Sequence, residues 1–362
     1  VVSASQVSST TTSSVSTSVS SFPSNSSKKL FSLSFMYSFF ISTVYNDEIW
    51  NYGFSYNIYK GLIPYLDFNM IITPMYHILG SLFIRVFGEY LISLHIFNSI
   101  VLASIMFISY RILGRCSLIL FPLVLINCYP GYNIFSVLLI LIIINLVGRE
   151  FKYKDYVLGI MVGLMFLVKQ TIGITLLVPL LVYSKKRLKS LGGFCLVVIT
   201  FIVYLVSRDA LYNFLDYCFL GMFDFGNSNR VLLFLPVEVI VILILVFKLY
   251  KSKGKDKKVL CILMYQVVVV PIMDDYHFMI GFIPVMYYIL DNIRIEKYKI
   301  KYYMIISLFF CSMWNFYVHE VDGINIYKDN SSYLYGRNVS SYVKISDISN
   351  YIDSNKELYA HI

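Results

Sequence analysis

The chain has 362 residues, of which 58% are hydrophobic and only 14% are charged. A water-soluble domain carries roughly 45–50% apolar and about 25% charged residues, so this composition excludes an ordinary soluble protein and predicts an integral membrane protein. The net charge of +9 is divided among many short segments, which disfavours nucleic acid as a partner. Six scattered cysteines without a CxxC pair indicate neither a disulfide framework nor a metal knuckle.

The first segment, residues 1–27, is rich in Ser and Thr and has no helical or strand periodicity. Such a segment cannot bury enough apolar surface to order itself, so we predict a disordered tail. The next unit, residues 28–318, is predicted to be the membrane module. Residues 319–362 are predicted to form an extracytoplasmic C-terminal segment.

From Lys28 onward, apolar runs alternate with short charged connections. We predict an all-α polytopic fold with about eleven transmembrane helices. The predicted spans are 30–45, 90–110, 117–130, 133–148, 156–169, 171–184, 191–207, 231–250, 259–273, 277–290 and 302–318. Several are shorter than the ~20 residues that cross a ~30 Å hydrocarbon core, so some helices are expected to be recessed or broken.

The segment Met75–Phe87 is apolar but short, and its 13 residues would make a helix only about 20 Å long. Its polar positions recur at helical spacing, at His77, Ser81, Arg85 and Gly88. This pattern predicts an amphipathic helix lying in the membrane interface rather than a further span.

Basic residues set the expected orientation, because Lys and Arg concentrate in cytoplasmic loops. With eleven spans, most of the 30 basic residues fall on the side of the N-terminus. We therefore predict a cytoplasmic N-terminus and an extracytoplasmic C-terminus. The long first outer loop, residues 46–89, and the shorter outer turns then carry most of the polar residues that are candidates for chemistry.

Asp47 and Glu48 open that loop directly after the first span. Two neighbouring carboxylates at a membrane surface suit a general base, because partial desolvation and like-charge repulsion can raise one pKa. The alternative is that they merely end the span on its outer side.

The residues after this pair carry a family resemblance. A Tyr-rich, helix-like segment is followed by Gly61-Leu-Ile-Pro64-Tyr65-Leu-Asp67-Phe68 and the amphipathic helix. This order resembles the GT-C class of membrane glycosyltransferases, in particular the group of glycosyltransferase family 39-like enzymes that includes protein mannosyltransferases and aminoarabinose transferases. Two later turns agree with it, Lys169-Gln170 and Asp274-Asp275-Tyr276-His277.

The resemblance implies transfer of a sugar from a polyprenyl-phosphate donor to an acceptor hydroxyl at the extracytoplasmic face, with inversion. It assigns Asp47 as the base, with Glu48 orienting it or the acceptor. The phosphate leaving group needs positive charge more than a strong acid. The substrate-binding residues expected from the pattern are Tyr65, Asp67, Lys169, Gln170, Arg230, Asp275 and His277.

The expected partners are a polyprenyl-phosphate-linked sugar, membrane lipid, and a glycan, lipid or protein acceptor. No cofactor is required, and a divalent metal at the Asp/His turn has weak support because one His follows two Asp. The expected location is the plasma membrane of a bacterium, since usage rich in Ile, Asn, Lys, Tyr and Phe is typical of an AT-rich genome. Fuller members of the family carry more chain after the last span.

Two other functions stay open. A polysaccharide polymerase or ligase with a diphosphate-linked donor also has a large outer loop, but that loop usually comes late in the chain. A multi-pass transporter predicts an internal repeat and charged residues at the midplane. No convincing repeat is visible, and Glu238 is the main ionisable residue inside a predicted span.

Overall fold

The computed structural model describes residues 25–41, 46–125, 131–221, 234–270, 272–293, 295–296 and 298–322. Across these ranges the secondary structure is helical and contains no strand, which confirms the all-α prediction for them. The first helix begins at Asn25, within the predicted tail. The rest of that tail and residues 323–362 lie outside the described ranges.

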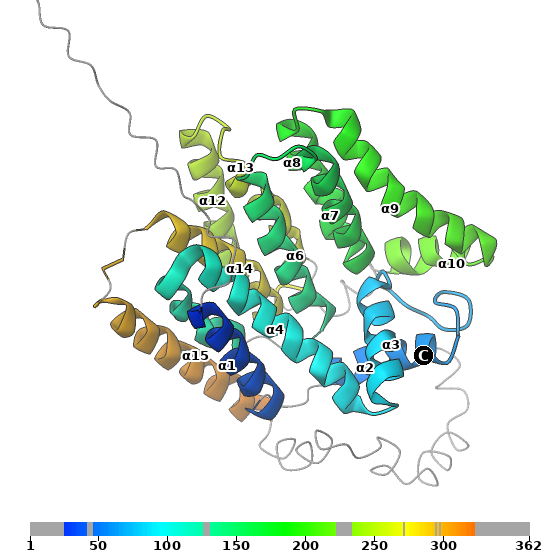
Figure 1. Cartoon of the computed structure of the whole chain (residues 1–362), viewed down its shortest axis with the longest axis horizontal. Coiled ribbons are helices and arrows are strands. Elements are labelled where there is room, and N and C mark those ends of the chain that lie inside the picture. The colour runs from blue at the N-terminus through cyan, green and yellow to red at the C-terminus, as the bar shows by residue number, and fades with distance from the viewer. Residues whose placement is uncertain are drawn as a thin grey trace, which may run out of the picture.

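Helices occupy almost all of the described chain (Figure 1). In chain order they are α1 (Asn25–Ile41), α2 (Asn46–Tyr59), α3 (Met75–Phe87), α4 (Leu91–Leu113), α5 (Phe121–Leu125), α6 (Tyr132–Val147), α7 (Lys154–Val168), α8 (Gln170–Tyr183), α9 (Arg187–Ser207), α10 (Leu211–Leu215), α12 (Leu235–Lys251), α13 (Lys257–Tyr265), α14 (Asp275–Asn292) and α15 (Ile300–Asp322). Short 3₁₀ turns at Gly114–Ile119 and Gln266–Val268 extend α4 and α13, and a π turn at Asp216–Leu220 extends α10.

A described helix overlaps each predicted apolar run. Two helical stretches, Leu91–Ile119 and Arg187–Ser207, are long and apolar enough to cross a membrane. Four further apolar helices are shorter, including those at Tyr132–Val147 and Gln170–Tyr183. Membrane association thus has support from helix length and composition, and the count of eleven spans stays a prediction.

Helices α7 and α9 pack through small residues. A Cβ atom at Gly159 would lie 2.0 Å from the backbone oxygen of Ser190, and one at Gly193 would lie 2.3 Å from that of Tyr156. Gly163 faces Val197 in the same seam. Such close backbone approach is the way in which helices associate where apolar surroundings supply no hydrophobic driving force.

Helix α3 has the predicted bounds but differs from the expected orientation. Its polar residues His77 and Ser81 are buried within the protein, whereas Ile78, Leu82 and Val86 form an exposed apolar stripe. The polar side chains turn inward because they have partners or backbone acceptors there. Arg85 is exposed beside this stripe, so the outward face is apolar apart from one basic residue.

The helix ends collect at two ends of the bundle. At the first, which we call the α2–α3 end, α2, α3 and α10 lie beside the ends of α7 and α9 (Figure 1). At the second, which we call the lysine-rich end, the end of α6 meets the starts of α7 and α13. Lys154 donates to the backbone oxygen of Val147 at 2.9 Å, and Tyr183 donates to that of Gly254 at 2.6 Å.

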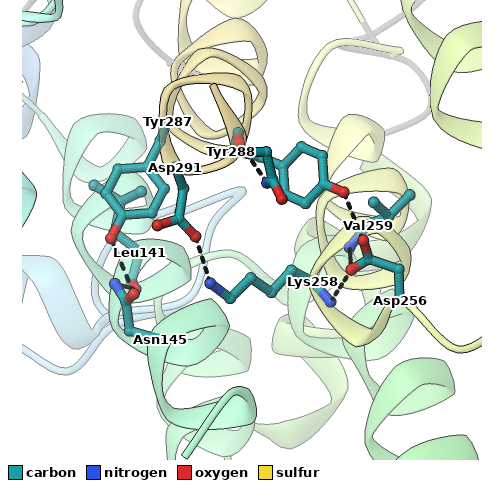
Figure 2. Close-up of polar contacts among 9 residues, drawn as sticks. Leu141, Asn145, Asp256, Lys258, Val259, Tyr287, Tyr288 and Asp291 are labelled. Carbon is teal, nitrogen blue, oxygen red and sulfur yellow. Dashed lines mark hydrogen bonds and ion pairs between the residues drawn. The ribbon is translucent and has the colours of Figure 1, made fainter. Parts of the chain in front are cut away.

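Polar bonds fasten α6, α13 and α14 together at the lysine-rich end (Figure 2). Lys258 Nζ lies 2.6 Å from Asp291, and the Tyr288 hydroxyl donates to Asp256 at 2.5 Å. Tyr287 donates to Asn145 at 2.9 Å. These bonds fix the ends of three helices relative to one another.

Candidate functional site

The predicted carboxylate pair lies in the first turn of α2. Glu48 is fully buried, and its Oε1 accepts a hydrogen bond from Asn98 Nδ2 at 2.8 Å and lies 2.8 Å from His95 Nδ1. Within the described residues its second oxygen, Oε2, has no hydrogen-bond partner. Asp47 precedes it in the same turn, but the side chain of Asp47 lies outside the described part.

The groups that hold Glu48 come from α4, and further bonds link them to α1 and α3. His95 Nε2 lies 3.2 Å from the backbone oxygen of Ser38, and the Tyr76 hydroxyl donates to Asn98 Oδ1 at 2.5 Å. The sequence analysis did not single out His95 and Asn98. Both could have been found from the sequence, because they are polar residues one helical turn apart in a largely apolar helix. Such residues usually need a partner.

One turn along α2 from Glu48, Asn51 Oδ1 contacts His77 Nε2 of α3 at 2.8 Å. His77 is fully buried, and its Nδ1 has no partner among the described residues. The start of α6 closes over this pair, since a Cβ atom at Gly131 would lie 3.1 Å from the Asn51 amide nitrogen. A polar patch therefore continues from α2 to α6.

Lys169 occupies the turn between α7 and α8. Its side chain is buried, and Nζ donates to Asn133 Oδ1 at 2.9 Å and lies 5.6 Å from the centre of the Tyr132 ring. No described carboxylate forms a salt bridge with it. The negative charge of Asp274 also acts on this amine.

Asp274 caps the start of α14 and accepts from the backbone N–H of His277 at 2.7 Å. The same oxygen lies 2.8 Å from His277 Nδ1. Burial raises the pKa of this carboxyl, but the bonds from His277 and the charge of Lys169 outweigh burial and leave the pKa below its ordinary value. The Lys169 turn and the Asp274–His277 turn thus lie within electrostatic reach of each other.

The Gly61–Phe68 segment forms a tight loop whose polar groups bond within it. The Tyr65 hydroxyl donates to the backbone oxygen of Ile72 at 2.7 Å, and Asp67 Oδ2 accepts from the backbone N–H of Ile63 at 2.6 Å. Gly61 and Tyr65 have φ values of 87° and 71°, the left-handed region that a sharp reversal requires. Tyr65 and Asp67 therefore shape the loop.

Gln170 fastens this loop to the helices. Its amide nitrogen donates to the backbone oxygens of Ile71 at 3.1 Å and of Cys218 at 2.7 Å. Asn213 adds a bond to the backbone oxygen of Tyr65 at 2.8 Å. Residues far apart in sequence thereby hold the loop against α8 and α10.

Two other predicted site groups cannot be placed. Arg230 and the side chain of Asp275 lie outside the described residues. Across the described part of the chain, no three His, Cys, Asp or Glu side chains gather closely enough to hold a metal ion.

An apolar groove of about 620 Å³ opens beside the loop, between α3, α7 and α9. Pro64, Ile78 and Phe201 contribute to its walls, and Arg208 lies at the edge of its lining. Leu167, two residues before Lys169, also lines it. Lys169 itself is not among the lining residues, because its side chain points toward Asn133 and Tyr132 of α6.

Comparison with protein-family models, with curated proteins and with solved structures finds no match.

Proposed function

We propose that the chain is a polytopic membrane glycosyltransferase that moves a sugar from a polyprenyl-phosphate donor to an acceptor hydroxyl. The observation that carries the proposal is Lys169, a buried amine with no described salt bridge, in a protein that also has an apolar groove beside α7. Inserting a lysine at membrane depth costs about 2.5–3.5 kcal/mol, so its retention favours an anionic ligand. A lipid phosphate supplies both the anion and the apolar tail.

In the proposed reaction, an acceptor oxygen attacks the anomeric carbon of the donor sugar. The new carbon–oxygen bond forms as the bond to the phosphate oxygen breaks, and Asp47 takes the proton of the hydroxyl. Attack opposite the leaving group inverts the anomeric centre. The departing polyprenyl phosphate carries the negative charge, which Lys169 stabilises.

The buried carboxylate Glu48 is assigned a positioning role. Its bonds to His95 and Asn98 fix the first turn of α2 against α4. Because Asp47 is its neighbour in that turn, the same bonds fix the backbone from which the base extends.

The groove between α3, α7 and α9 suits the first isoprene units of the donor. Its lining is mostly apolar, and the exposed stripe of α3 continues toward lipid. Arg208 supplies a second positive charge at this end. In this proposal the α2–α3 end faces the extracytoplasmic side and the lysine-rich end faces the cytoplasm of a bacterial plasma membrane.

The proposal is tested with purified full-length protein and a panel of polyprenyl-phosphate sugars, each with a set of short glycan and lipid acceptors. The expected result is acceptor-dependent release of polyprenyl phosphate from one donor. Release of polyprenyl diphosphate from a diphosphate-linked donor would instead identify a polymerase or ligase. Binding of each donor without turnover under any acceptor condition would contradict the proposal.

A further inference from the structure

A second polar pocket lies at the lysine-rich end, away from the site described above. It has a volume of about 150 Å³ and is formed where the α6–α7 connection meets the ends of α8, α9 and α13. Its lining contains two carboxylates and six lysines, namely Lys152, Lys154, Lys185, Lys186, Lys189 and Lys257. The pocket is therefore strongly positive.

The two carboxylates neutralise only part of this charge. Glu150 pairs with Lys154 at 3.2 Å and with Lys185 at 3.4 Å, and Asp155 accepts from the backbone N–H of Lys186 at 2.9 Å. Within the described residues, no carboxylate forms a salt bridge with the side chains of the other four lysines. Several like charges held around one cavity repel each other unless an anion joins them.

The helix starts at this pocket reinforce the positive potential. Helix α9 begins with Arg187, has no acidic residue in its first turn and has no side-chain cap. Helix α7 also lacks a side-chain cap but carries Asp155 in its first turn, and Asp256 caps the neighbouring helix α13. The N–H groups and the dipole of α9 therefore favour a further negative group at its start.

The residues around the pocket are apolar and aromatic. Such surroundings favour an anion that carries acyl chains over a small soluble anion. Leu188 in the first turn of α9 is 85% exposed, and Leu191, Phe151 and Tyr156 are also exposed. Further along α9, Ile199 and Val203 continue an exposed apolar surface outside the lining of the donor groove. An anion with acyl chains can place its headgroup among the lysines and its chains along α9.

We propose that this pocket binds the phosphate headgroup of an anionic phospholipid. Basic pockets between helices on the cytoplasmic side of a membrane recognise such headgroups. The site is separate from the proposed donor site, and its test does not depend on glycosyl transfer.

The test measures binding of phosphatidylglycerol and phosphatidylcholine to the full-length protein in detergent, by native mass spectrometry. We expect wild-type protein to prefer phosphatidylglycerol. The double variant Lys186→Gln/Lys189→Gln should bind it roughly 10- to 30-fold more weakly, because each lysine near an anionic lipid contributes about one factor of five. Lys251→Gln/Lys255→Gln is the matched control, since both lysines lie at the same end but outside the pocket lining, and it should bind as the wild type does.

Equal binding by the wild type and the pocket variant would overturn the proposal, as would equal losses in the pocket and control variants. Competition with inorganic phosphate shows whether the pocket prefers a lipid headgroup or a free phosphate ion. We expect it to displace the lipid poorly. Displacement by phosphate as effective as that by soluble phosphatidylglycerol would assign the pocket to a free anion. If the pocket variant is less thermostable in phosphatidylcholine, Lys152→Gln/Lys257→Gln takes its place with the same expected loss.

Discussion

At the scale of single residues, the account depends on what the buried charges contact. Lys169 donates to an asparagine and lies within electrostatic reach of Asp274. Glu48 is held by two side chains of α4. Burying either charge lowers the free energy of unfolding unless the group is hydrogen-bonded or binds a partner of opposite charge.

The charge of Lys169 predicts how donor binding responds to substitution. A phosphodiester donor keeps one negative charge throughout the neutral range, so a cation at this position favours its binding. Donor affinity should therefore fall when Lys169 is replaced by the uncharged Met and should be largely kept when it is replaced by Arg.

Lys169→Arg is the control, because a guanidinium keeps the positive charge. Lys169→Met should lower the rate of transfer about 10²–10³-fold, the usual cost of losing one donor to a developing anion. Equal donor affinity and rate for Lys169→Met and the wild type would contradict the role of Lys169.

Glu48 and Glu89 provide a matched pair for stability. Replacing Glu48 by Ala removes the acceptor that His95 Nδ1 and Asn98 Nδ2 share, which should cost about 1–3 kcal/mol or more. Glu89 accepts from Lys60 and from the Tyr56 hydroxyl at the surface, where solvent screens the ion pair and its contribution to stability is small. Apparent melting temperatures in detergent should therefore fall clearly for Glu48→Ala and little for Glu89→Ala; equal shifts would argue against a structural role of Glu48.

At the scale of elements, hydropathy and spacing predicted most helices, because lipid-compatible segments must satisfy their own backbone hydrogen bonds. The bounds of Met75–Phe87 followed from its punctuation by Pro74 and Gly88. The direction of its polar face was not predictable, since this depends on Asn51, a residue of another helix. The contact of Glu48 with His95 likewise joins residues 47 positions apart.

The glycine seam between α7 and α9 gives an element-scale prediction. Gly193→Ala places a methyl group against the backbone of Tyr156, and Gly159→Ala does so against Ser190. Each should separate the two helices and lower the melting temperature. Gly192→Ala is the control on the same helix, because nothing lies within 4 Å of its Cβ position. If Gly192→Ala lowered the melting temperature as much as Gly193→Ala, the loss would come from the backbone preference of the residue and not from helix packing.

At the scale of the whole molecule, the two ends of the bundle differ in charge. The lysine-rich end carries a pocket lined by six lysines, whereas the α2–α3 end carries the buried carboxylate and Lys169. Charge counting along the sequence predicted this separation. The assembly of α2, α6, α8 and α14 around one polar patch could not be predicted, because no local pattern encodes which helix ends meet.

This arrangement predicts the sidedness of the protein in cells. In a variant without its six native cysteines, Lys60→Cys should react with a membrane-impermeant maleimide added to intact cells, and Lys255→Cys should react only after permeabilisation. Lys60 lies after α2 and Lys255 lies between α12 and α13. Labelling of Lys255→Cys in intact cells would show that the orientation in the membrane is opposite to the proposed one.

The central claim is that a carboxylate at the start of α2 activates the acceptor of a lipid-linked sugar. The most direct measurement is the rate of polyprenyl phosphate release by purified Asp47→Asn, with Asp209→Asn as the control for the same change at an exposed position. We expect Asp47→Asn to lose at least about 10²-fold in rate while keeping the wild-type melting temperature and donor affinity, and Asp209→Asn to retain wild-type activity. Full activity of Asp47→Asn would contradict the account.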